Sequence, residues 1–239
     1  MLLAVFWGGL AATSLLIGYF LAKSRPPSRI IGIIMGIGAG ALIGAIAYDL
    51  IPEPVLTTAG APVSFLVGAL IFHAGNELVK RRGGDRRKSL SGEQQGGSGA
   101  AIFVGTMLDN IPESIILGMT FAMGGAVNLA FLLAVFVSNL PEGVGGTVNL
   151  ARAGYAPRKI LGLWILLVVI SAGCAGFGYL VLSWYPTADG HNAQAFAAGA
   201  MLTMLADAMM PEAFDRGREL AGIATVIGFL ATALLAFRQ

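Results

Sequence analysis

The stretch LDNIPE at residues 108–113 places two carboxylates, a carboxamide and a proline in the middle of an apolar run long enough to cross a bilayer. The next apolar run contains a related stretch, VSNLPE, at residues 137–142. An ionisable side chain at the centre of a membrane helix costs about 2.5–3.5 kcal/mol on insertion scales, so such groups normally face a partner or a water-filled path. The two stretches therefore predict a polar site inside a bundle of membrane-spanning helices.

The composition of the whole chain favours the same class of protein. Of the 239 residues, 56% are hydrophobic and 12% are charged, whereas about 25% of the residues in soluble domains are charged. The mean hydropathy is +0.78. The 34 glycines are typical of membrane helices that approach one another closely, and a single cysteine, Cys174, excludes an intrachain disulfide.

Apolar runs of roughly 20 residues are long enough to span a bilayer as helices. The sequence contains eight such runs, so we expect an all-α, polytopic membrane protein whose eight transmembrane helices form a single domain of residues 1–239. The predicted spans are 2–22, 30–52, 60–79, 100–123, 127–150, 158–183, 191–212 and 219–237.

The basic residues are distributed unevenly between the connections. Fourteen of the fifteen lysines and arginines follow the first, third, fifth or seventh span, and only Arg238 lies at the other end. The positive-inside rule then predicts cytoplasmic basic connections and both termini outside. The longest connection, 80–99, has a composition that cannot bury a core, so we expect a flexible basic cytoplasmic loop. The first span lacks the basic start of a signal peptide, and we expect a multi-pass protein of the cell (inner) membrane.

The second and seventh spans share a pattern that indicates internal symmetry. The tripeptide GAL at 40–42 precedes Pro52 by the same twelve residues that separate GAM at 199–201 from Pro211. Spans two and seven run in opposite directions, as do spans four and five, so we expect inverted-repeat symmetry within the bundle. Inverted repeats with proline-interrupted helices are typical of transporters.

Each central Pro-Glu pair is also expected to alter its helix. A proline inside a helix removes the donor for the carbonyl four residues earlier. We therefore expect open turns at Leu108 and Val137. Freed carbonyls persist at membrane depth only where protein, water or an ion satisfies them.

The polar residues of the two central stretches fall on one face of each helix, because they are three or four positions apart. Three buried carboxylates repel one another unless they are protonated or neutralised by a cation, and no Lys or Arg lies in the middle of any span. One alternative is that protonated carboxyl groups hold the helices together by hydrogen bonds. The favoured interpretation is a divalent-metal site formed by Asp109, Asn110, Glu113, Ser138, Asn139 and Glu142.

Further acids flank this site along the chain. Asp49 and Glu53 approach the outer face, whereas Asp207 and Glu212 approach the inner one, as a path for cations would require. The alternative is that Glu53 and Glu212 simply lie at hydrated ends of helices. We also expect His73 and Glu77, near the inner end of the third span, to form an interfacial hydrogen bond, with a secondary cation contact as the alternative.

These residues resemble the ZIP (Zrt- and Irt-like) divalent metal transporters, in their bacterial form. The resemblance rests on eight spans with outside termini, a variable loop after the third span, and Asn-x-Pro-Glu on spans four and five. It implies a helical bundle, often a homodimer, that moves zinc, iron, manganese or cadmium toward the cytoplasm. It also implies that Asn110, Glu113, Asn139 and Glu142 are metal ligands.

The chain departs from the family at two ligand positions. The family usually has His where this chain has Asp109, and a strong ligand where it has Ser138. The sixth span has no acid that could complete a two-metal site. Oxygen ligands suit Mn²⁺, Mg²⁺ or Fe²⁺, whereas imidazole favours Zn²⁺. We therefore expect a weaker preference for zinc than in a relative with His.

The sequence thus predicts a transporter of divalent metal cations in a lipid bilayer, with no nucleic-acid partner and no enzymatic activity. One alternative on the same fold uses the acids as a proton relay that drives another solute. A second alternative, a membrane hydrolase with paired carboxylates, is not supported by any Gly-x-Gly-Asp or His-Glu-x-x-His motif. A measurement of flux distinguishes the first alternative from metal transport, because only metal transport depends on a metal gradient.

Overall fold

Helices of membrane-spanning length make up most of the computed structural model, which describes residues 1–51, 55, 57–84, 99–124, 128–184 and 190–237. Eight helical segments among these residues are long and apolar enough to cross a membrane. The chain is therefore an all-α, multi-pass membrane protein, as predicted. Its elements are α1 (Leu2–Lys23), α2 (Ser28–Ala45), η1 (Ile46–Leu50), α4 (Ala61–Val79), η2 (Lys80–Gly84), α5 (Gly99–Gly124), α6 (Leu129–Arg152), α7 (Pro157–Trp184), α8 (His191–Met204), η3 (Leu205–Met209), α9 (Met210–Gly217) and α10 (Glu219–Ala236).

The helices end where the sequence supplies residues suited to turns. Gly60 (φ 90°) precedes α4, and Gly154 (φ 83°) lies in the turn between α6 and α7. Both are in the left-handed region that glycine enters at little cost. Pro157 begins α7, where its fixed φ suits the first helical turn. The predicted flexible loop falls largely on residues 85–98, which lie outside the described residues.

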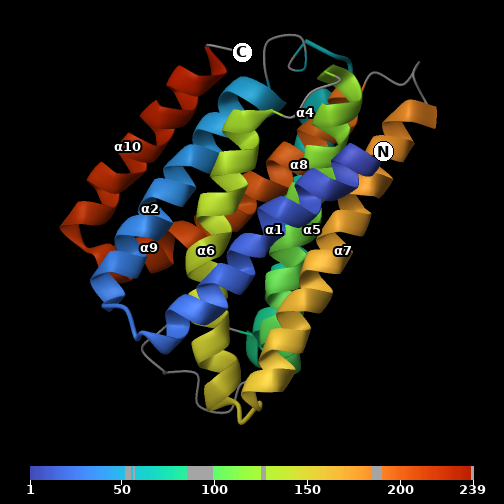
Figure 1. The fold of residues 1–239 in the computed structure, drawn as a ribbon. Helices are drawn as coiled ribbons and strands as arrows, with labels where there is room; N and C mark the ends of the chain where they lie inside the picture. The colour runs from blue at the N-terminus through green and yellow to red at the C-terminus, as the bar shows by residue number, and fades with distance from the viewer. Residues whose placement is uncertain (52–54, 56, 85–98, 125–127, 185–189, 238–239) are drawn as a thin grey trace.

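The helices pack in pairs around α6. α10 lies against α2 and α7 against α5, at opposite edges of the view in Figure 1, while α4 packs against α8. α1 crosses in front and contacts both α6 and α7. The beginning of α1 and the end of α10 lie toward the same end of the bundle (Figure 1), as an even number of spans requires.

Close helix contacts repeat in a way that matches the predicted internal symmetry. A Cβ added at Gly40 of α2 would overlap the carbonyl oxygen of Thr225 in α10. A Cβ added at Gly199 of α8 would overlap the carbonyl oxygen of Phe65 in α4 in the same way. Gly40 and Gly199 begin the two matching tripeptides of the sequence. The pairs α2–α10 and α4–α8 therefore correspond in packing as well as in sequence.

Two π-helical turns also occupy corresponding places. η1 ends the second span and η3 interrupts the seventh, and each turn ends two residues before a proline in the sequence, Pro52 or Pro211. Proline lacks an N–H group, and a π turn is one way in which a helix absorbs such an interruption. By contrast, α5 and α6 continue as α-helices through Pro112 and Pro141. The prolines expected to open the two central spans do not break them, although the carbonyl four residues earlier still loses its usual donor.

Substituting alanine for Gly40 or Gly199 is expected to destabilise the protein, because the added methyl group would displace the backbone of the neighbouring helix. Overpacking of this kind typically costs about 1–3 kcal/mol. The matched control is Gly173→Ala in α7, where a Cβ would meet nothing within 4 Å. The measurement is the thermal unfolding midpoint of the purified protein in detergent. Equal midpoints for Gly40→Ala and Gly173→Ala would contradict the close contact.

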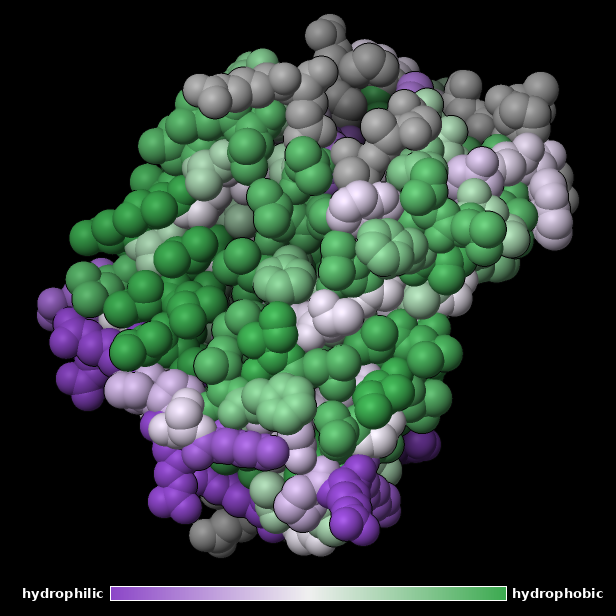
Figure 2. Space-filling view, in the orientation of Figure 1, coloured by the Kyte–Doolittle hydropathy of each residue, from purple (hydrophilic) through white to green (hydrophobic). Residues whose placement is uncertain are grey.

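The outer surface is apolar between its two ends. Figure 2 shows a broad apolar zone across the visible face, with the hydrophilic side chains gathered at the end below it. Apolar side chains exposed on the helices include Phe6, Leu70, Val169, Phe177 and Val226. Such a belt matches contact with lipid chains. The exposed basic residues Arg25, Arg29, Arg152, Arg158 and Lys159 belong to the helix ends and turns of the hydrophilic end.

Candidate metal site

The two central motifs meet across α5 and α6. Asn139 Nδ2 donates a hydrogen bond to Glu113 Oε2 at 3.3 Å, and each residue is 1% exposed. The oxygen of the same carboxamide, Asn139 Oδ1, is also buried and accepts no hydrogen bond from the described residues. A buried carboxamide oxygen beside a carboxylate provides two hard oxygen ligands for a cation.

The remaining motif residues are buried in the same two helices. Asp109, Asn110 and Glu142 are each 1% exposed. Asn110 Nδ2 donates a hydrogen bond to the carbonyl oxygen of Thr106, one turn earlier, at 3.0 Å. The burial of three carboxylates in adjoining spans is unusual in a membrane protein, where such residues mark functional sites.

Ser138 lies at a tight contact between α6 and α2. A Cβ added at Gly38 would stand 2.8 Å from Ser138 Cα, and Ser138 is 0% exposed. Its hydroxyl group donates a hydrogen bond to the carbonyl oxygen of Val135 at 2.9 Å. The absence of a side chain at Gly38 therefore allows α2 and α6 to approach each other.

The carboxylates do not form a compact cluster in this arrangement. Across the part of the chain that the structure describes, no group of three or more His, Cys, Asp or Glu side chains is placed to hold a metal ion. Asp109, Glu113 and Glu142 are each buried in the two packed helices. The pair formed by Glu113 and Asn139 is a hydrogen bond that bridges the two motifs.

Asp49 lies in η1 and reaches the start of α6. Its carboxylate is hydrogen-bonded to the side chain of Asn128, whose Oδ1 also accepts a hydrogen bond from Phe131 N at 2.8 Å and so caps α6. The predicted outer acid is thus placed beside the helix that carries the second motif. Its predicted companion Glu53 lies outside the described residues.

Asp207 lies in η3 and is paired with a residue of another span. Its Oδ2 is 2.9 Å from His73 Nδ1, and the side chains of the two residues are 27% and 55% exposed. The predicted bond between His73 and Glu77 does not form, because Glu77 is instead 3.0 Å from Lys80 Nζ. Asp207 of η3 is thus joined to α4 through His73.

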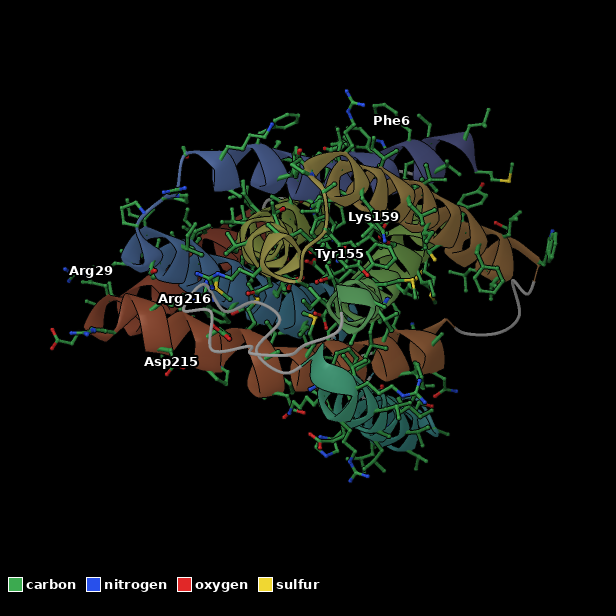
Figure 3. All side chains as sticks on the ribbon, turned by 90° about the horizontal axis from the view of Figure 1, so that it is seen from below. Phe6, Arg29, Tyr155, Lys159, Asp215 and Arg216 are labelled. Atoms are coloured by element: carbon green, nitrogen blue, oxygen red, sulfur yellow. The ribbon has the colours of Figure 1, made fainter. Side chains whose placement is uncertain are left out.

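Glu212 forms a buried ion pair that we did not predict. Its Oε2 is 2.9 Å from Arg216 Nη2, and the side chains of Glu212 and Arg216 are 11% and 7% exposed. Arg216 Nη1 also contacts Met35 Sδ at 3.9 Å. In Figure 3, Arg216 lies between α2 and α9, whereas Asp215 points away from the bundle. The signal in the sequence was the spacing of four between an acid and a base on one helix.

The fold and the buried acids define a multi-pass membrane protein with eight candidate spans and a carboxylate–carboxamide contact in its interior. No protein-family model matches the chain. The chain is similar to an Arabidopsis thaliana protein named "Putative zinc transporter At3g08650", with 26% identity over 207 residues. The match covers 82% of this chain and 32% of the plant protein. The chain therefore spans about a third of the length of this relative.

Proposed function

We propose that this protein is a ZIP-type transporter that moves divalent metal cations across a membrane through a site between α5 and α6. The observation that carries the proposal is the buried contact between Glu113 and Asn139. It lies in a stretch, 89–151, that contains no Lys, Arg or His. A divalent cation bound there would offset the negative charge of the carboxylates of Asp109, Glu113 and Glu142. The name of the plant relative, which refers to zinc transport, supports transport over catalysis.

The proposed route follows the acids along the bundle. Metal would pass Asp49 and Glu53, bind between the central spans, and leave past Asp207 and Glu212 toward the basic end, which the positive-inside rule assigns to the cytoplasm. The burial of the central residues and the place of Asp49 beside the start of α6 support this order. The residues proposed to contact the metal are Asp109, Asn110, Glu113, Ser138, Asn139 and Glu142.

Purified protein in proteoliposomes is expected to take up Mn²⁺ at least as well as Zn²⁺. The proposed ligands are all oxygen atoms, which suit Mn²⁺, whereas selection for Zn²⁺ usually employs imidazole or thiolate. The measurement is the response of a metal indicator trapped inside the vesicles, with protein-free vesicles as the control. A strong preference for zinc would contradict the assignment of an oxygen-only site, and the absence of uptake of either metal would overturn the proposed function.

A second candidate function is proton-linked transport of another solute. The pair formed by His73 and Asp207 favours it, because chains of Asp, Glu and His side chains within membrane spans mark proton relays. The same vesicles distinguish the two functions. Proton flux that is unaffected by adding or removing a metal gradient would favour the second candidate.

A further inference from the structure

A pocket of about 710 Å³ opens between α1, α6 and α7 at the hydrophilic end of the bundle. Three basic residues line it, Lys23, Arg25 and Arg152, and the described lining residues include no Asp or Glu. Along α6 the accessible lining extends from Arg152 at the helix end to Val148, which lies about 6 Å deeper at a rise of about 1.5 Å per residue. The pocket therefore combines a positively charged end with an interior wall.

The interior wall is mostly apolar. Ala22, Val148 and Ala151 contribute partly or fully exposed apolar surface to it, whereas Val144 and Ile160, which also line the pocket, are buried. Val148 is partly exposed on the pocket side of an otherwise buried stretch of α6. The hydroxyl group of Tyr19, another lining residue, donates a hydrogen bond to the carbonyl oxygen of Pro157 at 3.3 Å and so joins α1 to the start of α7. Helix packing thus fixes the sides of the pocket.

The three cations are not all explained by helix stability. Lys23 and Arg152 lie in the last turns of α1 and α6, where positive charge interacts favourably with the helix dipole. Arg25 lies outside any helix and has a φ of 50°, a left-handed conformation that is unfavourable for a residue other than glycine. The dipole therefore gives no reason for Arg25 to line the pocket.

The start of α2 adds backbone donors beside these cations. Ser28 lines the pocket and is the first residue of α2. The N-cap residue Pro27 provides no side-chain cap for the helix. Anions bind well at such helix N-termini, because the first N–H groups point outward and the helix dipole favours negative charge. Side chains and backbone thus both favour an anion at this end of the pocket.

We propose that the pocket binds one anionic phospholipid, with its phosphate group at Lys23, Arg25 and Arg152 and an acyl chain against the apolar wall. Basic pockets between membrane helices on the cytoplasmic side bind anionic headgroups. Inorganic phosphate would interact with the same cations but would leave the partly or fully exposed apolar side chains of Ala22, Val148 and Ala151 uncovered. The amphipathic lining therefore favours a lipid as the source of the phosphate group. This proposal is independent of the transported substrate.

The test is native mass spectrometry of the purified protein titrated with dioleoylphosphatidylglycerol or dioleoylphosphatidylcholine. Each basic residue near a membrane surface contributes about fivefold in affinity for an anionic lipid. The triple variant Lys23→Gln/Arg25→Gln/Arg152→Gln is thus expected to bind phosphatidylglycerol about 100-fold more weakly and no better than phosphatidylcholine. Arg29→Gln is the matched control, because Arg29 is exposed at the same end, points away from the bundle (Figure 3) and does not line the pocket.

Two further variants keep the proposal testable if the triple variant fails to fold. Arg25→Gln alone is expected to lower the affinity for phosphatidylglycerol about fivefold. Val148→Phe retains every cation but fills the apolar wall, so it is expected to weaken lipid binding as well. Unchanged phosphatidylglycerol binding in both variants would overturn the proposal. Displacement of the lipid by inorganic phosphate at equal concentration would also overturn it, by indicating a site for the anion alone.

Discussion

Replacing Glu113 or Glu142 with glutamine is expected to abolish metal uptake while leaving the protein folded. Each residue is 1% exposed and belongs to the proposed metal site. Glutamine retains the volume and one oxygen but removes the negative charge. Loss of a residue that merely supports a metal ligand costs about 10–100-fold in affinity or activity. Loss of a ligand carboxylate is therefore expected to reduce uptake by at least about 100-fold, to the level of empty vesicles.

The measurement is the initial rate of Mn²⁺ and Zn²⁺ uptake by proteoliposomes that contain equal amounts of folded protein. Glu219→Gln is the matched control, because Glu219 is an exposed glutamate at the start of α10. Size-exclusion chromatography before reconstitution checks that each variant is folded. Wild-type uptake by Glu113→Gln or by Glu142→Gln would refute the assignment of the site.

The second large effect is expected on stability, at the ion pair between Glu212 and Arg216. The Glu212→Gln variant would remove the carboxylate charge that lies 2.9 Å from the buried guanidinium group of Arg216. Removing one member of a buried ion pair typically destabilises a protein by about 3–5 kcal/mol. Replacing both members with apolar residues of similar volume is often neutral. The double variant Glu212→Leu/Arg216→Met is therefore expected to be close to the wild type in stability.

Thermal unfolding of the purified variants measures this difference. Asp215→Asn is the control, because Asp215 lies between the paired residues in sequence but points away from the bundle (Figure 3). If Glu212→Gln and Asp215→Asn unfold at the same temperature, the ion pair does not stabilise the packing of α9 against α2. The double variant also separates the two roles of Glu212. If it is stable but no longer transports metal, the carboxylate belongs to the route.

The sequence predicts the all-α architecture because apolar runs of membrane-spanning length leave little choice of secondary structure. The correspondence between spans two and seven was also visible, in the tripeptides that begin at Gly40 and Gly199. The position of the four prolines relative to the π-helical turns could not be predicted from the sequence. Pro52 and Pro211 follow π-helical turns, while Pro112 and Pro141 lie within regular α-helices. The local sequence Pro-Glu is the same in all four cases, so the surrounding helix packing must decide the outcome.

Polar partners were predictable only when they are close in sequence. Arg216 is four residues from Glu212, and this spacing on a helix indicates a contact. His73 is 134 residues from Asp207, and no pattern in the sequence brings α4 and η3 together. The contact between Glu113 and Asn139 was only partly predictable from the sequence. The sequence places both on polar faces of successive antiparallel spans, but the rotation of α5 against α6 that joins them depends on tertiary packing.

The most direct test of the central claim is calorimetric titration of Mn²⁺ and Zn²⁺ into the purified protein and its Glu113→Gln variant. If a metal ion binds between α5 and α6, the wild type and Glu219→Gln will show saturable binding, and Glu113→Gln will show none. A wild-type protein that binds neither ion, or a Glu113→Gln variant that binds with wild-type affinity, would contradict a metal site built on the contact between Glu113 and Asn139.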